Sequence, residues 1–170
     1  MLSKKVEKAL NDQVAHEFYA AYLYLAMMTY FDGRSLTGFA QWMRMQAQEE
    51  VEHAMKLLDF LLDRGGQVEL QALGKPPSEF ESPVAVMKAA LGHEQKVTGL
   101  IHDLYELAVA EKDYPTKVLL QWFIDEQVEE EKSAGEIVDQ HELVGDSVSA
   151  LLVIDERLGR RGPDSGGEGE

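Results

Sequence analysis

The stretch GGQVELQALGKPPSEFES, residues 65–82, lies between two long helical patterns and decides how they can be connected. It carries a Gly-Gly pair, a Pro-Pro pair and no helical period, which predicts an irregular connection. Outside it, apolar residues recur at steps of three and four, and this pattern predicts four helices over residues 3–31, 35–64, 82–111 and 114–143. The breaks at 32–34 and 112–113 are short, so each pair of helices is expected to form an antiparallel hairpin.

The length of the connection determines the predicted topology. Helices of about 28 residues are about 42 Å long, and about 16 extended residues reach roughly 50 Å. The connection can therefore run the length of the bundle, which makes the second and third helices parallel. The sequence predicts an all-α fold, a four-helix bundle with one long crossover loop.

The C-terminal part of the chain adds a short helix and a tail. Asp146 is expected to cap a fifth helix that ends near residue 158, and residues 159–170 are expected to be disordered because they are rich in glycine. We therefore predict one domain over residues 1–158 of the 170. The apolar side chains expected to face inward from the first two helices are Val6, Leu10, Val14, Phe18, Ala21, Leu25, Met28, Phe39, Met43, Ala47, Val51, Ala54, Leu58 and Leu61.

Composition excludes several classes of function. The chain has no cysteine, so it has neither disulfides nor thiolate metal sites. It carries 31 acidic against 16 basic side chains, a formal charge of −15, which argues against nucleic-acid and anionic-membrane partners. It shows no apolar run of about 18 residues and no secretory signal, so a cytoplasmic protein is expected.

Polar residues of metal-ligand type recur within the helical patterns. In QAQEEVEHAM, residues 46–55, Glu50 and His53 stand three apart and share one helix face. A shift of 77 residues relates the two hairpins weakly, and the polar pairs that it matches are Glu17 with Glu94, Glu50 with Gln127, and His53 with Glu130.

These carboxylates lie next to apolar residues that are expected to face the core. They are therefore expected to be at least partly buried, and the burial of their charges requires an explanation. Burying several ionised carboxylates together is costly and raises their affinity for protons. A bound polyvalent cation compensates the charge. Carboxylates with one imidazole suit iron or manganese better than zinc or copper. Taken singly, each of these residues could equally be part of a solvated helix surface.

Five stretches carry a resemblance to a known family: AYLYLAMMTYF (21–31), GFAQWMRMQAQEEVEHAMK (38–56), LLDRGGQVEL (61–70), PPSEFESP (76–83) and LQWFIDEQVEEE (120–131). Over about residues 3–158 the chain closely resembles the non-haem ferritins of bacteria and archaea. The resemblance implies a ferritin-like bundle with ferroxidase activity, in which dioxygen or peroxide oxidises Fe(II). It also implies storage of Fe(III) mineral inside a hollow homo-oligomer of 24 subunits.

The resemblance also implies a set of iron ligands. Glu17, Glu50 and His53 look like the ligands of one iron. Glu94 and Glu130 look like the ligands of the second, and Glu50 bridges the two. These five residues are the expected oxidation site.

Further positions match residues near such a centre. Gln127 stands where the family has a polar neighbour on the dioxygen side. Tyr24 and Trp122 match aromatics that pass electrons during oxidation, although both could be packing residues. His16 and His93 each neighbour an expected ligand but point about 100° away on the helix, which favours surface or subunit contacts.

A third iron site is implied by an acidic group on the second and fourth helices. Glu49, Glu126 and Glu129, together with Glu130, match this site of prokaryotic ferritins. A solvated acidic face is the alternative for the first three. Glu52 has no expected role.

The sequence also departs from related families. Bacterioferritins have a second Glu-x-x-His and a haem-binding methionine, whereas Gln127, Glu130 and Val51 stand at those positions here, so no haem is expected. Lys117 and Leu120 replace the pore carboxylates of animal ferritins, which leaves the iron entry route open. The competing interpretation is a di-iron or di-manganese peroxidase or oxygenase that retains its metals and stores no mineral.

Overall fold

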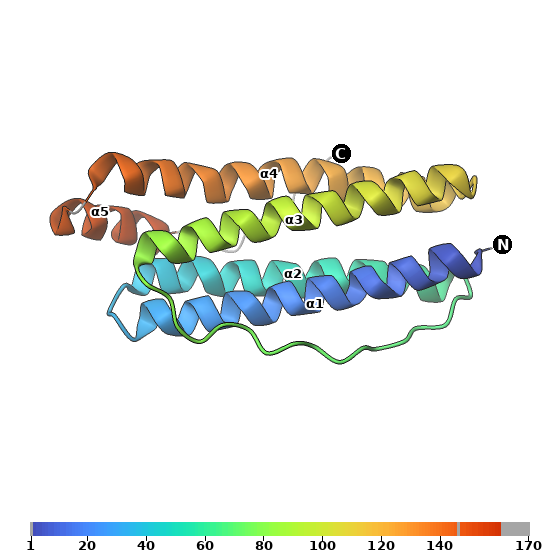
Figure 1. Cartoon of the computed structure of the whole chain (residues 1–170), viewed down its shortest axis with the longest axis horizontal. Coiled ribbons are helices and arrows are strands. Elements are labelled where there is room, and N and C mark those ends of the chain that lie inside the picture. The colour runs from blue at the N-terminus through green and yellow to red at the C-terminus, as the bar shows by residue number, and fades with distance from the viewer. Residues whose placement is uncertain (1, 146, 161–170) are drawn as a thin grey trace.

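The computed structural model describes residues 2–145 and 147–160, and this part of the chain contains helices and no strand. The helices are α1 (Lys4–Asp32), α2 (Thr37–Asp63), α3 (Pro83–Ala110), α4 (Tyr114–Val144) and α5 (Val148–Leu158). Four long helices form the bundle, and the short α5 packs at one end of it (Figure 1). The predicted all-α fold, with its five helices, is confirmed. Of the tail predicted over 159–170, residues 161–170 lie outside the described residues.

The long connection runs along the outside of the bundle beside α1 (Figure 1). It contacts α1 near both ends and in the middle: Gln67 N bonds to Glu7, Gly74 approaches Tyr19, and the Phe80 ring lies 5.5 Å from that of Tyr30. Because it returns to the end where α2 began, α2 and α3 point the same way. The predicted crossover topology is therefore confirmed.

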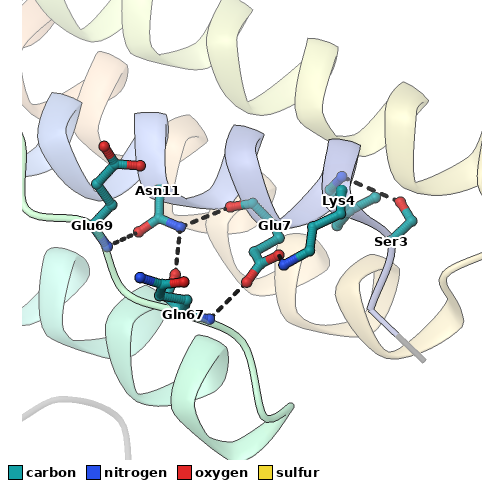
Figure 2. Close-up of polar contacts among 7 residues, drawn as sticks. Ser3, Lys4, Glu7, Asn11, Gln67 and Glu69 are labelled. Carbon is teal, nitrogen blue, oxygen red and sulfur yellow. Dashed lines mark hydrogen bonds and ion pairs between the residues drawn. The ribbon is translucent and has the colours of Figure 1, made fainter.

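The start of the crossover is fixed by hydrogen bonds from polar residues of α1 (Figure 2). Glu7 Oε1 accepts from Gln67 N at 2.7 Å, and Asn11 Oδ1 accepts from Glu69 N at 2.7 Å. Asn11 Nδ2 also donates to Gln67 O at 2.9 Å. These bonds satisfy backbone groups that a loop on a helix surface would otherwise leave unpaired.

Helix ends follow mostly from local sequence. Ser3 and Ser82 accept from the backbone N–H groups of Val6 and Ala85, as expected of N-caps. The predicted cap of α5 is wrong, because Ser147 caps that helix by accepting from Ala150 N, and Asp146 lies outside the described residues. Both residue types can cap, so their neighbouring positions could not be separated by composition.

The apolar core is divided into two clusters along the length of the bundle. One cluster contains Tyr24, Met27, Phe31, Phe39, Met43 and Met87, and the other contains Val6, Leu10, Leu57, Leu61, Ile101 and Phe123. On each long helix, the residues between the two clusters include buried polar side chains. We call this zone the polar layer; it contains the candidate ligands Glu17, Glu50, His53, Glu94 and Glu130, and their neighbour Gln127.

The polar layer explains why some inward positions were predicted wrongly. Leu25 and Val51 are each 42% exposed, and Phe18 and Leu58 are only partly buried. The predicted inward-facing stripe includes Phe18 and Val51, the apolar neighbours of Glu17 and Glu50. In the structure the carboxylates themselves face inward, so at these positions the buried face is shifted by one residue from the prediction.

The short helix α5 packs against the start of α2. A Cβ atom on Gly38 would lie 1.7 Å from the backbone oxygen of Asp155, so the close approach requires glycine. The buried Asp155 carboxylate accepts from Phe39 N at 2.9 Å. Leu36, the residue before α2, makes no side-chain capping bond. Asp155 therefore supplies from α5 the acceptor that this helix start lacks.

Candidate metal centre

The polar layer brings together candidate ligands from all four long helices. Glu17 comes from α1, Glu50 and His53 from α2, Glu94 from α3 and Glu130 from α4. Their side chains are at most 5% exposed. The four helices hold them in place because the apolar clusters above and below fix the helix faces that meet here.

One group of three ligand atoms lies between α1 and α2. An oxygen of Glu17, an oxygen of Glu50 and a nitrogen of His53 all lie within 4.8 Å of one another. Gln13 Nε2 holds Glu17 Oε1 at 2.8 Å, and His53 Nδ1 is 3.6 Å from Glu50 Oε2. Within the described part of the chain, Glu50 Oε2 is buried without a hydrogen-bond partner. A buried carboxylate oxygen without a donor is costly, so this atom is suited to a cation.

The α3–α4 side contributes two further carboxylates, each held by hydrogen bonds. Tyr24 donates its hydroxyl hydrogen to Glu94 Oε1, and Gln127 Nε2 donates to Glu94 Oε2 at 3.3 Å. Gln46 Nε2 donates to Glu130 Oε2 at 2.6 Å. These bonds orient both carboxylates in the absence of a metal.

The layer shifts the proton affinities of its members strongly. Burial raises the pKa of Glu17 to about 7, and burial with the nearby charges of Glu94 and Glu49 raises the pKa of Glu130 to about 8. Burial lowers the pKa of His53 to about 4, so its imidazole is neutral and available as a ligand. Near neutral pH these carboxyls thus retain protons that a bound cation would displace.

The donor set fits iron. Four carboxylates and one neutral imidazole supply hard oxygen and nitrogen ligands, the combination that suits iron or manganese. Burial raises the pKa values of Glu50 and Glu94. The positive charge of a bound cation would lower them again and keep both carboxylates ionised.

The predicted third site stays a prediction, and two of its four residues, Glu126 and Glu130, lie close together in the structure. A second group of ligand atoms, from His53, Glu126 and Glu130, lies within 4.8 Å. Glu49 is half-buried, and its negative charge helps to raise the pKa of Glu130. Glu129 is exposed and belongs to neither group of three found in residues 2–145 and 147–160.

The predicted aromatic residues lie beside the layer on two sides. Tyr24 is fully buried and bonded to Glu94. Trp122 packs edge-on against His53, with ring centroids 5.4 Å apart, and Lys56 Nζ lies 3.6 Å from the Trp122 ring centroid.

His16 and His93 are half-buried and lie outside both ligand groups. The His93 ring packs 6.0 Å from that of Tyr19. Their predicted roles in subunit contacts stay predictions, and Glu52 is exposed.

Sequence reasoning missed the residues that hold the candidate ligands. Gln13 and Gln46 bond to Glu17 and Glu130, Thr98 accepts from Gln127, and Glu131 accepts from Thr98. Gln13 and Gln46 each stand four residues before an expected ligand, a helical spacing that places them on the same face. That spacing was the available signal for the two glutamines.

Fold and site together define a class of protein, the carboxylate-rich four-helix bundles with a candidate metal centre between the helices. The profile of the family described as "Ferritin-like domain" matches residues 7–144, and the chain belongs to this family. Its relatives place it among the prokaryotic non-haem ferritins, so the predicted family and iron-storage function are confirmed.

The similar proteins cover almost the whole chain. The bacterial non-heme ferritin of Staphylococcus haemolyticus is 41% identical over 164 residues, 96% of this chain and 99% of the relative. That of Staphylococcus aureus is 41% identical over 161 residues, 95% of this chain and 97% of the relative. The open pore ferritin of the archaeon Archaeoglobus fulgidus superimposes with a TM-score of 0.94 at 49% identity, covering 95% of this chain and 99% of that structure.

Among the described helices, none is both long enough and apolar enough to cross a membrane.

Proposed function

We propose that the polar layer is a ferroxidase centre that binds two Fe(II) ions as substrate and oxidises them before storage. Glu17, Glu50 and His53 would hold the first ion, and Glu94 and Glu130 the second, with Glu50 shared. The observation that carries this proposal is the burial of these five side chains in one layer, in which Glu50 Oε2 lies 3.6 Å from His53 Nδ1 and accepts from no N–H group of the described residues. An ordinary buried carboxylate would have a donor at this position.

The proposed chemistry begins with proton release. The carboxyls of Glu17 and Glu130, whose pKa values are raised to about 7 and about 8, give up their protons when Fe(II) binds. Each Fe(II) then loses one electron. Dioxygen takes both electrons with two protons to give hydrogen peroxide, or hydrogen peroxide takes them with two protons to give two waters.

Neighbouring residues support these steps. Gln127, bonded to Glu94, lines the side that we assign to the oxidant. Tyr24, bonded to the same carboxylate, would supply a further electron if reduction of the oxidant takes more than the two electrons from iron. Glu49, Glu126 and Glu129 would accept Fe(III) as it leaves Glu130 for the mineral.

Storage requires an assembly that encloses a cavity, and we propose a homo-oligomeric shell of 24 subunits. Exposed apolar side chains on α4 and α5 support self-association: Leu143 is 85% exposed, and Val148 and Val153 are 69% and 67% exposed. Unpartnered apolar residues gathered at one end of a chain favour burial in a contact between subunits.

Aerobic iron loading tests this proposal. Fe(II) added in steps to the purified protein should be oxidised in a fast first phase and then accumulate as soluble ferric mineral in large particles. The iron content should far exceed two atoms per subunit. Turnover that stops near two irons per subunit, with a small oligomer on a sizing column, would instead indicate an enzyme that retains its metals, the peroxidase or oxygenase alternative.

A further inference from the structure

A chain of hydrogen bonds leads from the buried Glu94 towards the surface between α3 and α4. Gln127 Nε2 donates to Glu94 Oε2 at 3.3 Å and to Thr98 Oγ1 at 3.2 Å. The Thr98 hydroxyl in turn donates to Glu131 Oε1 at 2.6 Å. Glu94 and Gln127 are buried, while Thr98 and Glu131 are half-buried, so the chain ends close to solvent.

The direction of these bonds fixes which way the Gln127 amide faces. A carboxylate without a proton can only accept hydrogen bonds, and a threonine hydroxyl has a single hydrogen to donate. Because Glu131 takes that hydrogen, Thr98 is left as an acceptor towards Gln127. The amide nitrogen of Gln127 must therefore face Thr98, and its carbonyl oxygen must face elsewhere.

This orientation matters for Glu94, the candidate ligand of the second iron. With its nitrogen turned this way, Gln127 donates to both the carboxylate and the backbone oxygen of Glu94. A reversed amide would place its carbonyl oxygen against a carboxylate oxygen, where two acceptors repel each other.

We propose that Thr98 and Glu131 are positioning residues for the second iron. They fix the orientation of the Gln127 amide, and Gln127 in turn fixes the position of the Glu94 carboxylate. Neither residue has a hydrogen bond to Glu94, so the hydrogen-bond chain acts through Gln127, while the charge of Glu131 also acts on Glu94 directly. The inference rests on the proposed function, because it assigns Glu94 to the second metal.

Metal titration of the assembled protein separates this role from a general structural one. Thr98→Val removes the hydroxyl and keeps the shape of the side chain, whereas Thr98→Ser keeps the hydroxyl. Glu131→Ala removes the outer acceptor, and Glu136→Ala makes the same charge change at an exposed position of α4. Co(II) titrated anaerobically and followed by its visible absorbance reports the number of sites and the affinity of each.

We expect the unaltered protein to bind two Co(II) per subunit at the layer. Thr98→Val should weaken the second site about fivefold, the effect of losing one hydrogen bond, and leave the first site unchanged. Glu131→Ala should act in the same direction, and Thr98→Ser and Glu136→Ala should match the unaltered protein. In Fe(II) oxidation, Thr98→Val should raise the iron concentration that gives half the maximal initial rate and change the rate at saturation much less.

Two results would overturn the inference. One is a second-site affinity in Thr98→Val and Glu131→Ala equal to that of the unaltered protein. The other is an equal weakening of both sites, which would indicate a structural effect. If the unaltered protein itself bound no Co(II) at the layer, the proposed function would fail, and the inference would fail with it.

Discussion

The two apolar clusters stabilise the folded protein, whereas the polar layer between them lowers its stability. In the clusters, large side chains such as Phe31 and Phe39 are fully buried and stack with ring centroids 4.8 Å apart. In the layer, burial raises the pKa values of Glu17 and Glu130, which means that their ionised forms are less stable there than in water. The clusters form the fold, and the layer is a part of the core that is kept polar at a cost in stability.

The largest effect on stability should therefore come from a cluster. Phe39→Ala should lower the free energy of unfolding by about 3–5 kcal/mol, because it removes a fully buried aromatic side chain and leaves a cavity. Denaturant unfolding of the metal-free protein measures this. Glu50→Gln is the matched change in the layer and should leave the stability equal or higher, since it removes a charge that burial disfavours. A large loss from Glu50→Gln would contradict the comparison.

The rate of Fe(II) oxidation, unlike stability, should depend mainly on the residues of the polar layer. Glu50→Gln should lower the initial rate of Fe(II) oxidation by roughly a hundredfold or more, because the shared ligand of both irons is lost. Stopped-flow absorbance measures the rate of Fe(III) formation. Glu52→Gln, the same change at an exposed position on α2, should leave the rate unchanged. Equal rates for the two variants would show that Glu50 is not a ligand.

A smaller effect is expected for Glu130, which we assign to only one of the two irons of the ferroxidase centre. Glu130→Ala should slow the initial oxidation by about tenfold. Rapid-mixing kinetics at one and at two Fe(II) per subunit would place the loss at the second ion. An unchanged first phase would remove Glu130 from the ligands, and Glu136→Ala serves as the control for charge.

The smallest effect is a dependence of stability on pH. The pKa values of Glu17 and Glu130 in the folded protein are raised to about 7 and about 8, so the folded state binds more protons than the unfolded state. Their contribution is therefore fully present at low pH and lost as pH rises through these values. His53, with its pKa lowered to about 4, has the opposite effect, but that effect is complete by about pH 6.5.

Between about pH 6.5 and 8, the metal-free protein should lose on the order of 1 kcal/mol of stability. Calorimetric unfolding temperatures across this range measure the loss. Co(II) should reduce the slope, because it replaces the protons. A metal-free protein whose stability rises over this range would contradict the pKa shifts of the layer.

The sequence predicted the fold well because the signals were local. The apolar period, the serine caps and the Pro-Pro stretch determine the helices and the crossover. The inward positions were predicted less well where carboxylates interrupt the stripe, as at Leu25 and Val51, because a hydrophobic period contains no information about a buried charge.

For the site, sequence reasoning identified candidate residues that the fold brings together, but it missed their hydrogen-bond partners. Gln46 reaches Glu130 on α4, and Thr98 reaches Glu131 from α3. The first contact joins the two hairpins across 84 positions, and the second joins the two helices of one hairpin across 33 positions, so both depend on how the helices pack against each other. No motif in the sequence contains that information.

The central claim is that the polar layer binds two iron ions around Glu50. Diffraction at the iron absorption edge, from crystals soaked anaerobically with Fe(II), tests it most directly. The account predicts two anomalous peaks, one among Glu17, Glu50 and His53 and the other among Glu50, Glu94 and Glu130. Iron found at surface carboxylates, with no peak beside Glu50, would contradict it.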